Sequence, residues 1–259
     1  MQKLPATTGW RWIKQGFAIF AKKPAELTTL FILYFFMMVI IGIVPIVGQL
    51  AQLILIPVFA MTFMQASLNV ENELRVFPSL LLTAFRSPQR KTLLMLGMLY
   101  LLAALLAFGA AALVDDGTLW QLLTSDGDPD PAKIQQSHIL LTVLFGALVY
   151  IPAAMAFWFA APLIAWQQMP LPKALFYSFF AVLRAGRAFL LYALGWIALG
   201  VILPFLVSRV LAQLTGSLFL PIIILMPLSI SLSVAMYCSF YATYIEIFGK
   251  PAPAVDVEA

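Results

Sequence analysis

The side chains that usually carry enzyme chemistry are scarce in this sequence of 259 residues. It contains one cysteine, Cys238, and one histidine, His138, so an intrachain disulfide or a metal cluster built on thiolates is excluded. The sequence also lacks the GxSxG, HExxH and phosphate-binding loop motifs of hydrolases and nucleotide-binding proteins. We therefore expect a protein that is not an enzyme and that binds no metal or other cofactor.

Acidic and basic residues avoid the centres of the long apolar runs. Glu26 begins the first run, where a negative charge complements a helix N-terminus, so a capping or ion-pair role is expected. Glu246 lies near the end of the last run, and Arg209 marks the outer end of the fifth. Ionisable groups inside a bilayer usually mark ion pathways, so their absence from these centres argues against an ion-coupled pump.

Three prolines, Pro57, Pro152 and Pro227, lie inside the second, fourth and sixth apolar runs. A proline removes one helical hydrogen bond and kinks the helix. Three kinks at one depth would shape a central cavity or a gate. The other interpretation is that they are bends that let helices pack. We favour this second interpretation, because proline is common in membrane helices.

Basic residues gather at the ends of short amphipathic segments, where they would contact anionic lipid headgroups. The candidate headgroup contacts are Arg11, Lys14, Lys22, Lys23, Arg86, Arg90, Lys91, Arg184 and Arg187. Trp10 and Trp12 flank one of them, and such an alternation of aromatic and basic residues can stack nucleobases. Phe17 and Phe20 continue the same apolar face, however, so we expect anchoring at the membrane surface and no nucleic-acid partner.

The composition requires lipid as the outer solvent. The chain is 63% hydrophobic and only 10% charged, whereas a soluble domain needs about 25% charged residues to cover its surface. Its aromatic content of 14% fits helices with Trp and Tyr at the headgroup level. A helix needs about 20 apolar residues to cross a bilayer. Six runs qualify: Leu27–Val47, Leu50–Leu68, Thr92–Val114, Ile139–Trp166, Phe189–Ser208 and Leu218–Ile247. The fold class is therefore an all-α integral membrane protein, and a tight turn at Pro45–Gln49 joins the first two spans.

The distribution of charge predicts the orientation in the membrane. Of the 15 Lys and Arg residues, thirteen lie on the side of the two termini and two, Lys133 and Arg209, on the other side. The loop Asp115–Ser137 on that other side carries five aspartates. Cytoplasmic loops are enriched in basic residues, so both termini are predicted to be cytoplasmic in a bacterial inner membrane.

The predicted domain organisation is a single membrane domain, residues 1–259, with a threefold internal repeat. Each odd-numbered span follows an amphipathic segment with a basic end, and each even-numbered span contains one of the three prolines. The units are approximately 8–70, 77–168 and 172–249, followed by a flexible tail at 250–259. Repeats of one orientation predict three hairpins around an axis along the membrane normal. The apolar positions of the three amphipathic segments are Trp10, Ile13, Phe17 and Phe20, then Leu81, Leu82 and Phe85, then Leu175, Phe176, Phe179, Phe180 and Leu183.

Several short motifs resemble an uncharacterised family of proteobacterial inner-membrane proteins. They are Leu4-Pro5-Ala6, Gly9-Trp10-x-Trp12, Gly16-Phe17, Phe20, Lys23-Pro24 and Phe85-Arg86-Ser87-Pro88. The resemblance extends over nearly the full chain and implies a bacterial inner membrane, but it implies no activity. A more distant resemblance is to the membrane domains linked to glycerophosphodiester phosphodiesterases. Since the hydrolase domain is missing here, this second resemblance implies no catalysis.

The leading functional hypothesis is a non-enzymatic membrane protein that acts as a scaffold, an accessory subunit or a factor in envelope or lipid homeostasis. Its expected partners are anionic membrane lipids, with another membrane protein or a second copy of the chain as further candidates. The alternative is a small permease or lipid transporter with a cavity near Pro57, Pro152 and Pro227.

Overall fold

The computed structural model describes residues 4–114, 139–216 and 219–251, and the described residues form helices without any strand. Six helical segments are long and apolar enough to cross a membrane, as the sequence predicted. They are Pro24–Gly42, Val47–Glu71, Arg90–Ala112, Leu141–Gln167, Gly186–Thr215 and Phe219–Phe248. The acidic loop and His138 lie outside the described residues.

Three helical hairpins contain these six segments. The first pairs α2 (Pro24–Gly42) with α3 (Val47–Glu71). The second pairs α5 (Arg90–Ala112) with α8 (Ile139–Phe157). The third pairs α11 (Gly186–Ile197) and its continuation with α13 (Phe219–Phe248). Shorter elements precede the hairpins or extend them: α1 (Thr7–Lys22), η1 (Pro78–Leu82), α4 (Thr83–Arg86), α9 (Ala160–Gln167), α10 (Leu171–Arg184), η2 (Ala198–Ile202) and α12 (Leu203–Thr215).

The structure corrects the position of one turn expected from the sequence and shows irregularities inside two of the spans. The first turn lies at 43–46 and not at Pro45–Gln49, because α2 ends at Gly42 and α3 begins at Val47. The fourth span breaks between α8 and α9. In the fifth span a π-helical turn, η2, lies just before Pro204, which has no N–H to continue the regular α-helical bonding.

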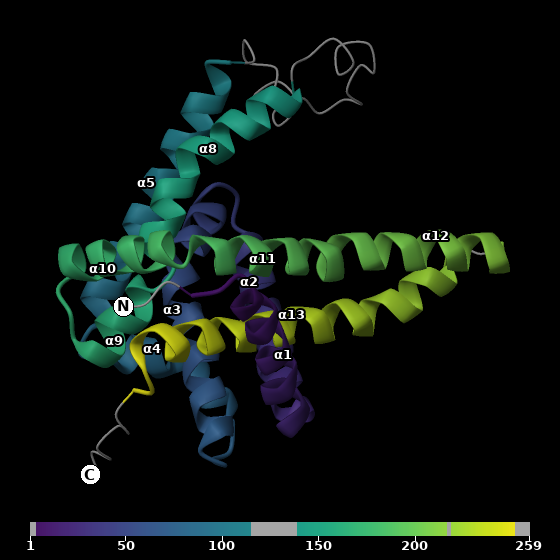
Figure 1. The fold of residues 1–259 in the computed structure, drawn as a ribbon, viewed down its shortest axis with the longest axis horizontal. Coiled ribbons are helices and arrows are strands. Elements are labelled where there is room, and N and C mark those ends of the chain that lie inside the picture. The colour runs from purple at the N-terminus through teal and green to yellow at the C-terminus, as the bar shows by residue number, and fades with distance from the viewer. Residues whose placement is uncertain (1–3, 115–138, 217–218, 252–259) are drawn as a thin grey trace.

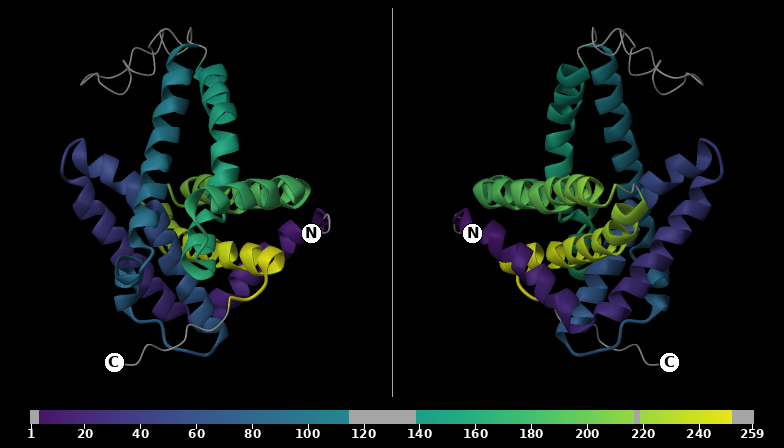
Figure 2. Two further views of the ribbon diagram at one scale, coloured as in Figure 1. Left: turned by 90° about the vertical axis from the view of Figure 1, so that its left-hand side faces the viewer. Right: turned by 90° about the vertical axis from the view of Figure 1, so that its right-hand side faces the viewer.

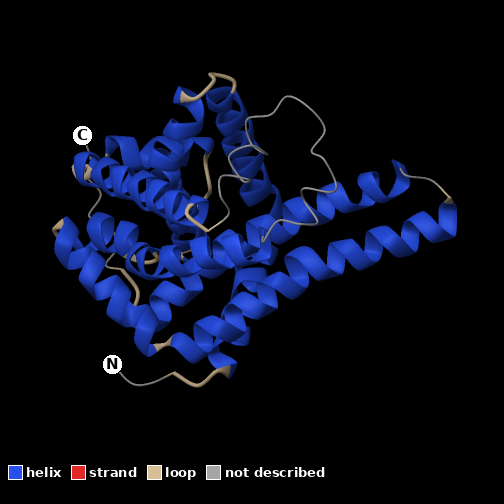
Figure 3. Cartoon of the chain, turned by 90° about the horizontal axis from the view of Figure 1, so that it is seen from above, coloured by secondary structure: helices blue, strands red, loops and turns tan. Residues whose placement is uncertain are grey.

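The three hairpins pack together at one end, which we call the base of the fold. From this base they run in different directions. Figure 1 shows α12 and α13 running away from α5 and α8, and Figure 2 shows the α2–α3 hairpin diverging from the α5–α8 hairpin. Seen from above, α12 and α13 again extend far from the other helices (Figure 3). The hydrophobic core lies at the base, where the three returning helices α3, α8–α9 and α13 supply most of the fully buried residues.

The halves of the hairpins beyond the base expose large apolar side chains. Ile40 on α2, Leu148 on α8 and Ile223 on α13 are all more than 60% exposed. Apolar surface on this scale would be strongly unfavourable in water. The hairpins therefore suit a hydrocarbon solvent.

Each short segment that precedes a hairpin packs against a returning helix of the hairpin before it. The helix α1 packs against α13 and also α11, η1 and α4 pack against α3, and α10 packs against α8 and α9. The N-terminal helix thereby contacts the C-terminal hairpin and closes a ring of packed elements. The division of the chain into three repeated units stays a prediction.

The environments of the three amphipathic segments differ. On α1 the side chains of Trp12, Ile13 and Ile19 are buried against protein. Of the positions expected to face lipid, Ile13 is therefore covered, Trp10 is exposed, and Phe17 and Phe20 are half-buried, so the position of this helix at a membrane surface stays a prediction. In the second unit the segment is only a short 3₁₀ turn followed by the four residues of α4. On α10, Phe176 and Leu183 are exposed, and the position of this helix at a membrane surface stays a prediction.

Candidate functional site

Seven of the nine candidate headgroup contacts are exposed and have no hydrogen-bond or ion-pair partner within the described residues. We call the segments that bear most of them, between each short helix and the span that follows it, the cationic elbows: 22–23, 86–91 and 184–187. Because the described acidic residues do not neutralise them, these side chains remain available for anions. The seven residues are Lys14, Lys22, Arg86, Arg90, Lys91, Arg184 and Arg187.

The other two candidates bind within the protein. The Arg11 guanidinium lies 2.6 Å from a Glu246 carboxylate oxygen, which ties α1 to the end of α13. Lys23 Nζ donates to the Leu74 carbonyl at 2.8 Å and lies 3.6 Å from Glu26. This contact with Lys23 confirms the ion-pair role predicted for Glu26. Glu26 also accepts a hydrogen bond of 2.6 Å from the Val76 N–H.

A polar network joins the ends of the three returning helices. Trp166 Nε1 on α9 donates to Gln65 on α3 at 3.1 Å. On α13, the Tyr241 hydroxyl donates to Glu71 at 2.9 Å. Lys250 also lies 3.3 Å from this carboxylate, which anchors the beginning of the C-terminal tail. These pairings satisfy polar groups at the base of the fold and leave no free acid or base for catalysis among the residues named here.

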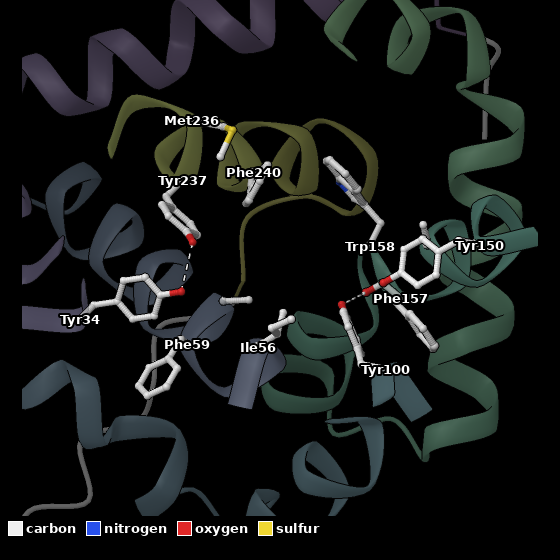
Figure 4. A pocket seen from close by; sticks show the side chains of 12 residues that line it. Tyr34, Ile56, Phe59, Tyr100, Tyr150, Phe157, Trp158, Met236, Tyr237 and Phe240 are labelled. Atoms are coloured by element: carbon white, nitrogen blue, oxygen red, sulfur yellow. Dashed lines mark hydrogen bonds between the residues drawn. The ribbon is translucent and has the colours of Figure 1, made fainter. Parts of the chain in front are cut away.

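A central pocket of about 450 Å³ lies where the three hairpins meet (Figure 4). Every hairpin contributes to its wall. The lining residues are Tyr34, Ile56, Phe59, Ala60, Tyr100, Tyr150, Ala154, Phe157, Trp158, Met236, Tyr237 and Phe240.

The central pocket offers aromatic rings and hydroxyl groups, without a carboxylate, an amine or an imidazole in its lining. The Tyr237 hydroxyl donates to the Tyr34 hydroxyl at 3.4 Å, and the Tyr100 hydroxyl donates to the Phe157 carbonyl at the same distance. Both pairs are drawn in Figure 4. Such a wall can hold an apolar or amphipathic guest, but it lacks the acid–base groups that turnover usually requires.

The three candidate prolines do not themselves line the central pocket. All three lie inside their helices. Ile56, next to Pro57, and Ala154, two residues after Pro152, are lining residues. Pro227 lies nine residues before the nearest lining residue on its helix, Met236. A gating role for the prolines therefore stays a prediction.

A second pocket, of about 490 Å³, adjoins the central one. It lies among α8, α10, α11 and α13, and its wall is almost entirely apolar. Four residues, Ala154, Trp158, Met236 and Phe240, line both pockets. The lining residues of the second pocket alone are Ile151, Met155, Val182, Phe189, Tyr192, Ala193 and Trp196.

The aromatic lining of the two pockets is the feature that sequence reasoning missed. Trp and Tyr were expected at headgroup level, whereas Tyr34, Tyr100 and Tyr237 line the interior and Tyr192 is fully buried. The available signal was that Tyr34, Tyr100 and Tyr237 lie ten or eleven residues from an end of their spans. Cys238 is buried, and the described residues contain no group of three potential metal ligands.

Comparison with known proteins shows which proteins this chain resembles in sequence. No family model matches the chain, and no solved structure matches it significantly. The chain is 36% identical over 258 residues to a probable inner membrane protein of Burkholderia thailandensis, covering 97% of this chain and 94% of the relative. No match supports the resemblance to phosphodiesterase membrane domains. The similarity is full-length and agrees with six membrane-spanning helices, so the chain belongs to the same family of inner membrane proteins as this Burkholderia relative.

Proposed function

We propose that this protein is a non-enzymatic scaffold or accessory protein that organises anionic lipid in the inner leaflet, and so serves envelope or lipid homeostasis. The observation that supports the proposal best is the set of seven exposed cations that have no partner among the described residues, distributed over α1 and the three cationic elbows. A basic residue near an anionic surface contributes about 1 kcal/mol to lipid attraction. Several such residues around one base would collect anionic lipids.

The proposal requires the base of the fold to face the cytoplasm. The excess of basic residues beside the termini supports this orientation, with both termini inside. Reporter fusions test it: a green fluorescent protein attached after Lys250 should fluoresce, whereas alkaline phosphatase inserted in the loop at 115–137 should be active. The opposite pair of results would overturn the orientation and, with it, the contact with the inner leaflet.

Lipid retention tests the proposed function directly. The purified full-length protein is reconstituted in nanodiscs that contain phosphatidylglycerol and phosphatidylcholine, and the lipids around it are quantified. Replacing Arg86, Arg90, Arg184 and Arg187 with Gln should lower the enrichment of phosphatidylglycerol and reduce its dependence on salt. A matched control replaces the paired Arg11 with Gln. Unchanged enrichment in the fourfold variant would contradict the proposal.

A second candidate function, a small permease or lipid transporter, is favoured by one observation, the central pocket lined by all three hairpins. It predicts flux of a solute or lipid in proteoliposomes and loss of that flux when Pro57, Pro152 and Pro227 become Ala. It also predicts that Ala60→Trp, which fills the pocket, blocks flux while the fold is retained. Vesicles that remain inert to a broad panel of solutes and lipids would exclude this candidate.

A further inference from the structure

The second pocket adjoins the third cationic elbow. Val182, which lines the pocket, lies two residues before Arg184, and Phe189, also in the lining, lies two residues after Arg187. Both arginines are exposed and lack an acidic partner among the described residues. Two phosphate-binding side chains and an apolar pocket are therefore neighbours at one point of the fold.

The length of the second pocket along α11 suits an acyl chain. Its lining on this helix extends from Phe189 to Trp196. From Arg187 to Trp196 there are nine residues, which correspond to about 14 Å of helix. An acyl chain reaches across half of a hydrocarbon core of about 30 Å and is therefore about 15 Å long. A lipid with its phosphate at the elbow would thus extend one chain along the whole pocket.

Three tyrosine or tryptophan side chains line the second pocket, and two of them are already paired, whereas the buried indole N–H of the third, Trp196, has no partner among the described residues. The Tyr192 hydroxyl is paired with Ser239 Oγ at 2.6 Å. The Trp158 indole N–H donates to Thr243 Oγ1 at 3.3 Å. Because a buried water needs two to four polar partners, this pocket favours hydrocarbon over water.

The second elbow lacks this combination. The pocket beside it has a volume of only about 130 Å³, and its lining includes the polar side chains of Gln65, Thr83 and Ser87. It is too small and too polar to hold an acyl chain. The difference between the two elbows gives an internal control within one molecule.

We propose that the second pocket is a binding site for one anionic phospholipid of the inner leaflet. Its phosphate binds Arg184 and Arg187, and one of its acyl chains lies against Trp158, Phe189 and Trp196. This inference rests on the proposed function and deepens it, because it places a defined lipid at one elbow in addition to the general attraction of all three.

The test measures lipid binding to the delipidated full-length protein in detergent, by native mass spectrometry and by titration with phosphatidylglycerol. Changing both Arg184 and Arg187 to Gln should weaken phosphatidylglycerol binding about 30-fold at low ionic strength, from the loss of two charges. Ala193→Phe should fill the second pocket and abolish the retained lipid. The matched controls are Arg86→Gln with Arg90→Gln for the charges and Ala60→Phe, in the central pocket, for the volume.

The outcomes distinguish the proposed lipid site in the second pocket from the general attraction of the protein to anionic lipid. If both double arginine variants lose lipid equally while Ala193→Phe keeps it, the site is overturned and the general attraction to anionic lipid stands. If no cation variant changes binding, both proposals fail. Equal affinity for phosphatidylcholine overturns the role of the arginines. Thermal unfolding verifies that each variant folds, and Ala193→Leu replaces the Phe variant if the larger ring prevents folding.

Discussion

At the scale of single residues, Trp10 and Trp12 lie two positions apart on α1 and have opposite environments. Trp12 is 0% exposed and its ring centroid lies 5.1 Å from that of Phe189 and 5.9 Å from that of Tyr192. Trp10 is 45% exposed. An aromatic side chain packed on several rings contributes through burial and through ring geometry together.

We expect Trp12→Ala to lower the free energy of unfolding by about 3–5 kcal/mol, because it leaves a large cavity between α1 and α11. The matched change Trp10→Ala should alter it by no more than about 0.5 kcal/mol, as is usual for exposed positions. Thermal unfolding of the two variants in the same detergent compares them. Similar losses for both would contradict the packing of α1 described above.

At the scale of elements, α1 approaches its neighbours closely at glycines. A Cβ atom added at Gly16 would lie 2.6 Å from both the Ala235 carbonyl oxygen and the Ser239 Cβ of α13. A Cβ at Gly109, on α5, would meet no atom within 4 Å. The first glycine thus permits close helix packing of the kind that small residues provide in membranes, whereas the second has no such role.

Gly16→Ala should therefore destabilise the protein by about 1–3 kcal/mol, through a clash that only backbone movement can relieve. Gly109→Ala should be neutral or stabilising by up to about 1 kcal/mol, because alanine favours the helix. The midpoint of thermal unfolding measured by size-exclusion chromatography separates the two. A stabilised Gly16 variant would show that α1 and α13 are not tightly packed.

The elements could be predicted from the sequence to very different extents. The six spans follow from apolar length alone, and basic residues mark where the first, third and fifth begin. Which face of α1 is buried does not follow, because Trp12 and Trp10 are equally apolar and only the partner helices α11 and α13 decide. The same holds for Tyr34 and Tyr237, whose pocket exists because three distant hairpins meet there.

At the scale of the whole molecule, the hairpins differ in length. The helix α2 has 19 residues, about 28 Å, whereas the fifth and sixth spans have 30 residues each, about 45 Å. The hydrocarbon core is about 30 Å thick, and a helix that is too long for it tilts. Figure 1 agrees with such a tilt, because the third hairpin runs in a different direction from the other two.

In an oriented bilayer we therefore expect the third hairpin to be inclined much more steeply from the membrane normal than α2. Solid-state NMR of protein labelled at Leu33 on α2 and at Leu206 on α12 measures both inclinations. Thicker bilayers should reduce the tilt of α12 and leave α2 nearly unchanged. Equal tilts would indicate that the hairpins rearrange in the membrane into a parallel bundle.

The packing of α1 on α13 has a consequence for biosynthesis. The ribosome makes α1 before α13, so the face of α1 with Trp12 and Gly16 has no permanent cover until the third hairpin has been inserted. Until α13 is in place, the membrane surface or a chaperone must cover this face of α1. A chain that stops before the third hairpin would keep this face uncovered and offer quality-control proteases a signal of incomplete synthesis.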